Sequence, residues 1–175
     1  MNDIKKYVLG FLFDADGQHV ALIIKARPAW QRGKLNGIGG KILPGETPLR
    51  AMTREFAEET GCDEPVPWQW FCDLGDAGAS GGPTWMVSCF RARLGVGVHG
   101  GKYVAQVVTD EPTGWARVSN VVTGATLRKP VFLSGRDEGT TMAGRLALPN
   151  LGWLVPLALD TAVRGAMVDD KGENF

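Results

Sequence analysis

The residues best suited to chemistry are three glutamates grouped in one short stretch of the chain. Glu55, Glu58 and Glu59 lie within five positions. On an α-helix, Glu58 would lie about 60° to one side of Glu55 and Glu59 about 40° to the other, so that three carboxylates share one face. A hard divalent cation takes such oxygen ligands and bridges carboxylates to phosphate oxygens. The spacing therefore predicts a site for metal-assisted phosphate chemistry.

Such a cluster is costly for a helix that carries it without a cation. Like charges at i,i+4 destabilise a helix by ~0.2–0.5 kcal/mol, and negative charge in the last turn opposes the helix dipole by ~0.3–1 kcal/mol. The alternative interpretation of a charged stretch is a solvated helix surface. The residues that precede the glutamates argue against this alternative.

The helix that must position these glutamates is predicted over Pro48–Thr60. Thr47 is a suitable N-cap, Pro48 is tolerated in the first turn, and Gly61 stands where a left-handed residue ends a helix. The residues expected to bury the neighbouring face are Leu49, Met52 and Phe56.

The segment from Gly40 to Cys62 reads GKILPGETPLRAMTREFAEETGC and resembles the Nudix box. The box has a glycine, five residues, a glutamate, seven residues and then Arg-Glu, an apolar residue, any residue, Glu-Glu, any residue and Gly. The matching positions are Gly40, Glu46, Arg54, Glu55, Phe56, Glu58, Glu59 and Gly61. Cys62 departs from the aliphatic residue usual at that position.

The resemblance implies an α/β (α+β) fold, with an α/β/α sandwich around a mixed β-sheet. It implies that Glu55, Glu58 and Glu59 bind Mg²⁺, with Mn²⁺ as the alternative ion. It also implies that a carbonyl of the Gly39–Gly40 turn, that of Gly40, adds a ligand. It leaves open which glutamate orients or deprotonates the attacking water. Glu46 and Arg54 would form a structural pair. The substrates would be small nucleotides with a diphosphate linked to another group.

A narrower resemblance points to MutT-type nucleoside triphosphate pyrophosphatases. Asn36-Gly37-Ile38-Gly39-Gly40-Lys41 is similar to their Asn-Gly-x-Gly-Gly-Lys run, which implies that Asn36 contacts the base. The position of Glu111 implies a further metal-site carboxylate. The late helix start also resembles theirs, but Asn150 and Leu151 replace an acidic pair that reads an oxidised purine. This replacement argues against specificity for oxidised purines.

Four residues are candidates for binding the substrate, and two of them have alternative roles. Trp30 either stacks on a base or covers the core. Asn150 either reads a base or caps the late helix. Lys41 belongs to a basic group around the glycine-rich loop, some of which can meet phosphates. Asn36 is the fourth candidate, as a contact to the base. His19 and His99 are interpreted as lone structural residues without a partner at metal-ligand spacing.

The remaining elements are expected to form one domain over residues 1–175. Strand-like runs cover 6–13, 19–25, 68–74, 84–94 and 114–118, and Asp14–Gly17 reads as a hairpin turn. Residues 28–45 are predicted to be irregular, and 121–148 allow no assignment. A late helix is predicted over 151–168, followed by a frayed tail.

The composition limits the class of partner and the compartment. Nineteen basic residues balance nineteen acidic ones, which lacks the basic footprint of a protein that binds a nucleic-acid polymer. No apolar run approaches the ~20 residues of a membrane span. The three cysteines have no metal-type spacing, and no secretory signal is recognisable, so a cytoplasmic protein with reduced thiols is expected.

The sequence leaves three candidate functions open. The first is hydrolysis of a (d)NTP to the (d)NMP and pyrophosphate. The second is cleavage of ADP-ribose or a nucleotide-sugar. The third is a non-catalytic module that senses a nucleotide, although such modules often lose box glutamates and this chain has all of them. A homodimer is left open.

Overall fold

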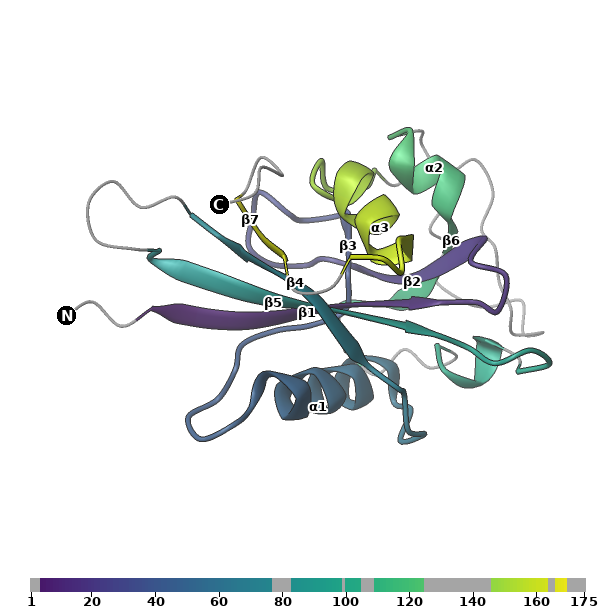
Figure 1. The fold of residues 1–175 in the computed structure, drawn as a ribbon, viewed down its shortest axis with the longest axis horizontal. Helices are drawn as coiled ribbons and strands as arrows, with labels where there is room; N and C mark the ends of the chain where they lie inside the picture. Colours follow the sequence, from purple (N-terminus) through teal and green to yellow (C-terminus); the bar gives the residue numbers. More distant parts are fainter. Residues whose placement is uncertain are drawn as a thin grey trace.

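The computed structural model describes residues 4–76, 83–98, 100–104, 109–124, 146–163 and 166–169. These residues form a sandwich in which one mixed β-sheet lies between helices (Figure 1). The strands are β1 (Lys5–Phe13), β2 (His19–Ile24), β3 (Leu35–Asn36), β4 (Gln69–Gly75), β5 (Trp85–Arg93), β6 (Thr113–Arg117) and β7 (Ala166–Asp169). The helices are α1 (Pro48–Thr60), η1 (Gly100–Lys102), α2 (Val118–Val122) and α3 (Leu151–Leu159). The expected α+β class is confirmed.

The sheet runs in the order β3-β2-β1-β5-β4-β7, and β6 pairs with β2. β1 and β5 are parallel over nine residue pairs, and β4 and β7 are also parallel, whereas the other strand pairs are antiparallel. The predicted bounds of β1, β2, β4, β5 and β6 agree with these strands to within one residue.

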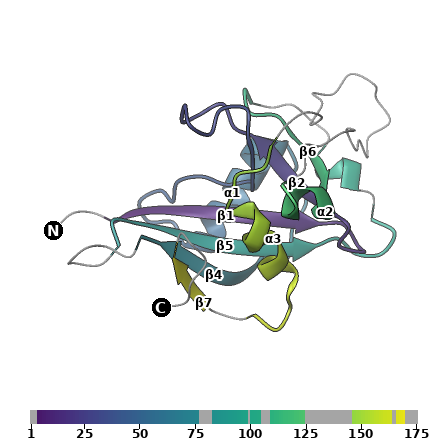
Figure 2. The same ribbon diagram turned by 90° about the horizontal axis from the view of Figure 1, so that it is seen from above.

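Helices cover both faces of the sheet, so the central strands are buried on both sides. In Figure 1, α1 lies on one face and α2 and α3 lie on the other, and Figure 2 shows the same layers from above. Val8–Phe13 of β1 is buried throughout. This continuous apolar run is typical of a strand that is covered on both faces.

Two hydrophobic clusters hold the layers together. Between α1 and the sheet, Met52 and Phe56 pack with Trp68 and Ile38. On the other face, Leu151 and Leu154 of α3 pack with Phe11 and other strand residues. Leu49 was expected to be buried with Met52 and Phe56, but it is 49% exposed. It lies in the first turn of α1, beyond the part of the sheet surface that Met52 reaches.

The late helix is shorter than predicted. It ends at Leu159, and Ala166–Asp169 form β7 where the sequence pattern had suggested more helix. Asp160 begins a turn, with its side chain accepting from the N–H of Ala162 and its carbonyl accepting from the N–H of Val163. Pro156 also removes one helical donor. The parallel pairing of β7 with β4 supplies backbone hydrogen bonds that a longer helix would have made internally.

The segment after β2 is only partly irregular. β3 pairs with β2, and Ile38 and Lys41 form isolated bridges with Gly10 and Tyr7 of β1. The segment from Ile38 to Lys41 therefore runs beside residues 7–10 of β1 before the chain enters α1. Of residues 121–148, 125–145 lie outside the described residues, and Val118–Val122 form α2.

His19 has a partner, so its interpretation as a lone histidine was wrong. Its Nδ1 lies 2.6 Å from Asp14 Oδ2, and its backbone N–H donates to Asp14 Oδ1 at 2.9 Å. Asp16 accepts from the N–H of Gln18. These bonds close the β1–β2 turn. His99 lies outside the described residues.

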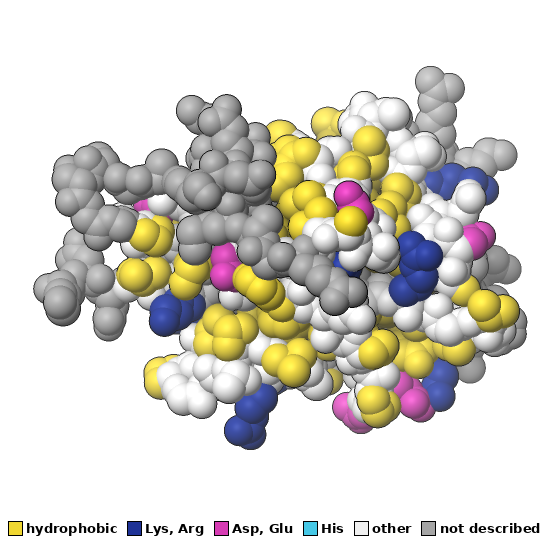
Figure 3. Space-filling view, in the orientation of Figure 1, with side chains coloured by type: hydrophobic (Ala, Val, Ile, Leu, Met, Phe, Trp, Pro, Cys, Tyr) yellow, Lys and Arg dark blue, Asp and Glu magenta, His cyan; other side chains and the backbone are white. Residues whose placement is uncertain are grey.

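The three cysteines are free and buried, as expected from their spacing. Within the described ranges, no helix is long and apolar enough to cross a membrane. On the face seen in Figure 3, acidic and basic side chains of the described residues alternate without gathering into a patch of one sign.

Candidate active site

The helix α1 carries the three box glutamates, and its ends form as predicted. Thr47 Oγ1 accepts from the N–H of Arg50, and Pro48 occupies the first turn. Gly61 has φ 68°, and its N–H donates to Ala57 O at 2.8 Å. A residue with a Cβ disfavours this left-handed conformation, which explains the glycine. The local sequence alone therefore fixes both ends of α1.

Arg54 is the centre of an ion-pair network that joins α1 to the preceding loop. Its Nε donates to Glu46 Oε1 at 2.7 Å and its Nη2 to Glu46 Oε2 at 3.0 Å, which is a bidentate pair. Nη1 donates to Glu55 at 2.8 Å and to Glu58 at 3.0 Å. Nη2 also donates to the carbonyl of Lys41.

The same network sets the charge state of Glu46. Hydrogen bonds from Arg54, and then from the N–H of Leu43, lower the pKa of Glu46 to about 2. The pKa of Arg54 is raised, first by Glu46 and then by Glu55. Both groups remain charged at neutral pH, so the geometry suits the structural role expected for this pair.

Glu55 lies directly against the backbone of the Gly39–Gly40 turn. A Cβ built on Gly40 would lie 2.6 Å from both carboxylate oxygens of Glu55. A Cβ on Gly39, whose φ is 150°, would lie 2.2 Å from the carbonyl oxygen of Val8. Only glycine at both positions allows the turn to approach β1 and the Glu55 carboxylate this closely.

Glu59 faces the same turn and is largely removed from water. Its Oε2 accepts from the N–H of Gly39 at 3.0 Å. Burial raises the pKa of Glu59 to about 8, against the lowering effects of Lys25 and the Gly39 N–H, and the charges of Glu55 and Glu111 raise it further. These carboxylates are therefore close enough to repel one another.

Glu111 reaches this region from the loop before β6. It is 8% exposed, and its Oε1 accepts from the N–H of Ala26 at 2.6 Å and of Arg27 at 3.0 Å. Its Oε2 accepts from Lys25 Nζ. Burial alone would raise the pKa of Glu111, but the Lys25 ammonium and the two N–H groups lower it below its usual value.

Lys25 is the residue of this site that the sequence did not single out. Its side chain is 15% exposed, pairs with Glu111 and also lowers the pKa of Glu59. The sequence showed it only as one of several basic residues near the glycine-rich loop. Lys25 and Glu111 are 86 positions apart, so no local spacing marks the pair.

The donor set fits a divalent cation. Glu59 is repelled by both Glu55 and Glu111, and a cation between these carboxylates would relieve that repulsion with the oxygen ligands that Mg²⁺ prefers. The glutamates do not converge as tightly as ligands around an ion. Among the described residues, the one acidic and histidine group with all its ligand atoms within 4.8 Å is Asp14, Asp16 and His19.

Each predicted metal ligand already has a partner within the protein. Glu55 accepts from Arg54, Glu59 from the N–H of Gly39, and Glu111 from Lys25. Glu58 is exposed and accepts from Arg54. The Gly40 carbonyl accepts from the N–H of Val8 at 2.8 Å, which leaves it one further lone pair. Direct ligation by Glu55 or Glu58 would therefore require that carboxylate to share or leave Arg54.

Two of the predicted substrate-binding residues, Asn36 and Asn150, lie on neighbouring stretches. Hydrogen bonds from Leu35 N–H to Leu146 O and from Leu148 N–H to Leu35 O, at 2.9 Å each, place the start of α3 beside β3. Asn36 and Asn150 follow directly on these two segments. Asn36 Oδ1 accepts from the N–H of Gly37 at 2.9 Å, which leaves its amide donors for another partner.

The alternatives for Trp30 and Asn150 are narrowed by their surroundings. Trp30 is 65% exposed, so its interpretation as a cover for the core was wrong. Asn150 is at the N-cap position of α3, but its side chain makes no capping hydrogen bond there. Lys41 is exposed, and its backbone carbonyl accepts from Arg54.

Comparison with known proteins agrees with this geometry. A family model described as the NUDIX domain matches residues 4–116, which is more than half of the chain. No curated protein matches.

Several solved structures share the fold. The mutator MutT protein from Bacillus halodurans is 20% identical, with a TM-score of 0.55 and coverage of 98% of this chain and 95% of that one. MutT NUDIX hydrolase from Burkholderia pseudomallei is 21% identical, with a TM-score of 0.51 and coverage of 67% and 85%. The NUDIX domain of Shewanella oneidensis NrtR, solved with ADP ribose, is 18% identical, with a TM-score of 0.54 and coverage of 70% and 79%. These structures show the shared fold, and the family model, which matches residues 4–116, shows that the chain belongs to the Nudix hydrolase family.

Proposed function

We propose that this Nudix hydrolase cleaves a (d)NTP to the (d)NMP and pyrophosphate with Mg²⁺, and that Mn²⁺ can replace Mg²⁺. The observation that carries the proposal is that Glu55 and Glu59 lie against the Gly39–Gly40 turn, with Glu111 close enough to raise the pKa of Glu59. Charge repulsion at such a site favours cations, and phosphoryl transfer requires mainly positioning and charge compensation.

In this proposal, Glu55, Glu59 and Glu111 hold the metal ions. Bound Mg²⁺ supplies activation of water and neutralisation of the polyphosphate charge. Glu58 becomes a metal ligand when it exchanges its ion pair with Arg54 for the metal ion. Glu46 and Arg54 keep the loop and helix in register, because the bidentate pair fixes their separation.

Glu59 and Glu111 differ in their proton states before a metal binds. The raised pKa of Glu59 lets its carboxyl group hold a proton near neutral pH. Glu111 is held ionised by Lys25 and two backbone donors. Binding of a cation would displace the proton from Glu59, and we propose the resulting carboxylate as the group that accepts a proton from the attacking water.

In this proposal, the base is recognised at the junction of β3 and α3. The amide donors of Asn36 and the side chain of Asn150 face hydrogen-bonding edges of a base, and the exposed Trp30 stacks on its ring. Lys41 meets the phosphates. Because Asn150 and Leu151 replace the acidic pair, we propose a substrate with an unoxidised base.

A test of the active site compares three single variants. Glu59→Gln and Glu55→Gln keep size but remove a charge, and each should lower Mg²⁺-dependent turnover by roughly 10³-fold or more. Glu64→Gln is the matched control, because Glu64 is exposed and pairs with Lys102 away from the site. Wild-type rates for Glu59→Gln would refute the site assignment.

A second test identifies the substrate. Equal concentrations of nucleoside triphosphates, ADP-ribose and nucleotide-sugars are assayed with Mg²⁺, and the phosphate-containing products are measured. Pyrophosphate and a monophosphate from a triphosphate support the proposal. Preferential cleavage of ADP-ribose would favour the second candidate, to which the fold shared with the ADP-ribose complex of NrtR lends some support. Tight binding without cleavage in Mg²⁺ or Mn²⁺ would indicate a sensing module.

A further inference from the structure

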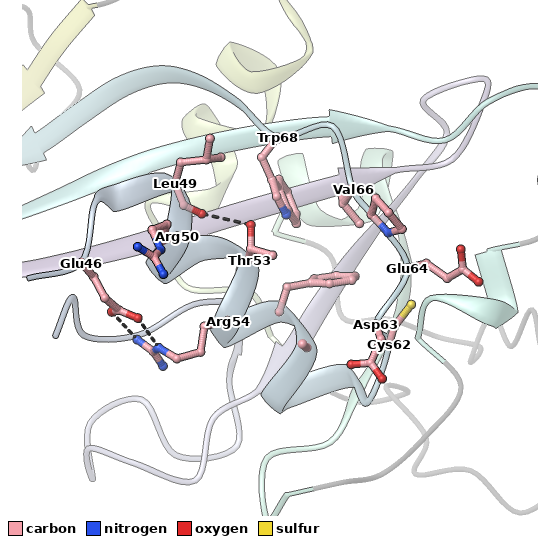
Figure 4. A pocket seen from close by; sticks show the side chains of 13 residues that line it. Glu46, Leu49, Arg50, Thr53, Arg54, Cys62, Asp63, Glu64, Val66 and Trp68 are labelled. Atoms are coloured by element: carbon pink, nitrogen blue, oxygen red, sulfur yellow. Dashed lines mark hydrogen bonds and ion pairs between the residues drawn. The ribbon is translucent and has the colours of Figure 1, made fainter.

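A pocket lies on the side of α1 that faces away from the box glutamates. It has a volume of about 720 Å³ and lies between α1 and the segment from Cys62 to Trp68 (Figure 4). This volume is in the range of small-molecule sites. Around the helix, Thr53 lies about 160° from Glu55 and Ala57 about 200°. Both residues line the pocket, whereas Glu55, Glu58 and Glu59 do not.

The walls of the pocket are mainly apolar. Phe56 and Trp68 meet edge to face, with ring centroids 5.4 Å apart and an interplanar angle of 71°. Val66 and the half-exposed Leu49 extend this surface towards the opening. A flat apolar molecule could therefore cover the small exposed part of Trp68 and remove the exposed part of Leu49 from water.

Trp68 also carries an unused polar group, which is buried beside this pocket. The residue is 8% exposed, and its Nε1–H has no hydrogen-bond acceptor within the described residues. In Figure 4 the nitrogen of its ring faces the α1 wall near Thr53. A buried donor without a partner is costly, and most such groups in proteins are paired. An acceptor on a bound molecule, with a small rotation of Thr53, would satisfy it.

The charges around the pocket nearly cancel. Arg54 is engaged by Glu46, and Glu64 is paired with Lys102. Arg50 and Asp63 remain at the rim, and neither makes an ion pair with another described residue within 4.0 Å. One positive and one negative group at the opening favour neither an anion nor a cation.

We propose that this pocket binds a small, uncharged, planar molecule whose carbonyl or ring nitrogen accepts the Trp68 Nε1–H. The site is separate from the metal-binding face of α1. It touches that face through Arg54, which lines the pocket and also holds Glu55 and Glu58. A molecule bound there would therefore contact the residue that positions two box glutamates.

The test uses benzamide, an uncharged ring with one carbonyl acceptor, and the full-length ¹⁵N-labelled protein. The indole N–H signal of Trp68 is assigned by its loss in Trp68→Phe. Benzamide should shift this signal saturably, with a Kd on the order of 1 mM for a molecule of this size. No shift at the solubility limit of benzamide would overturn the proposal.

Three variants separate this pocket from other sites. Ala57→Leu fills the cavity from a partly exposed helix position and should weaken binding at least tenfold. Trp68→Phe keeps the ring but removes the donor, and should weaken binding roughly 3- to 10-fold by other amide signals. Glu59→Gln should bind benzamide as the wild type does. Binding that survives Ala57→Leu, or that Glu59→Gln abolishes, would contradict a site on this side of α1.

Discussion

Lys25 Nζ donates a hydrogen bond to Glu111 Oε2, and both side chains are largely buried. Lys25 follows β2, and Glu111 precedes β6, so the antiparallel pairing of these strands brings the two residues together. The pair places one positive charge beside the carboxylates that we propose as metal ligands. It therefore compensates part of their charge before any cation binds.

Removal of Lys25 should destabilise the metal-free protein. Lys25→Met leaves Glu111 buried and ionised with only two backbone donors, and the loss of one partner of a buried pair costs about 3–5 kcal/mol. Urea unfolding in EDTA measures the change. The double variant Lys25→Met with Glu111→Gln should recover much of the loss, because no unpaired charge remains. Equal losses in the single and double variants would show that the charge pair is not the cause.

Gly40 should be intolerant of a side chain for a catalytic reason. Gly40→Ala would place Cβ 2.6 Å from the Glu55 carboxylate, and the resulting displacement should lower kcat by roughly 100-fold. Gly45→Ala is the control, since φ is 83° there but nothing lies within 4 Å of the added Cβ. It should lose only about 1 kcal/mol of stability through backbone strain. Similar kinetics for both variants would mean that Glu55 tolerates the clash.

The pKa of Glu59 predicts how pH affects stability and metal binding. A carboxyl group with a pKa of about 8 in the folded state and a lower value when unfolded stabilises the fold most at acid pH. In EDTA, that contribution should decline as pH rises from about 4.5 to 8. Thermal unfolding of wild type and Glu59→Gln across this range checks the prediction, because the variant should lack the decline.

The proton on Glu59 should compete with Mg²⁺ for the Glu59 carboxylate. With limiting Mg²⁺, activity should rise with pH towards about 8, and more Mg²⁺ should move this rise to lower pH. A rise that keeps its position at all Mg²⁺ concentrations would show that the titrating group does not bind the metal.

Arg91 should stabilise the C-terminal end of α3 and the turn that follows it. It is 8% exposed, and its guanidinium donates to the carbonyls of Ala158, Asp160 and Val163. Arg91→Met keeps the stem but leaves these carbonyls without a donor, and should cost about 2–4 kcal/mol. Arg93→Met, exposed on the same strand, should change the free energy of unfolding by less than about 0.5 kcal/mol. Urea unfolding compares the two, and equal effects would rule out a special role for Arg91.

Several features were determined by the sequence itself because they depend on neighbouring residues. The bounds of α1 follow from Thr47, Pro48 and Gly61, and five strands follow from their apolar runs. The box spacing also indicates the shared face of Glu55, Glu58 and Glu59. Capping, turn formation and side-chain periodicity act over a few residues, so a single sequence displays them.

Other features were decided only by the tertiary structure. Residues 166–169 had a pattern compatible with helix, yet they form β7 because the edge of β4 offers hydrogen bonds. Lys25 meets Glu111 only through the pairing of β2 with β6, and Arg91 meets the end of α3 only through packing of that helix on the sheet. Electrostatic and hydrogen-bond partners depend on distance in space, and residues far apart in the chain leave no local pattern that shows they will meet.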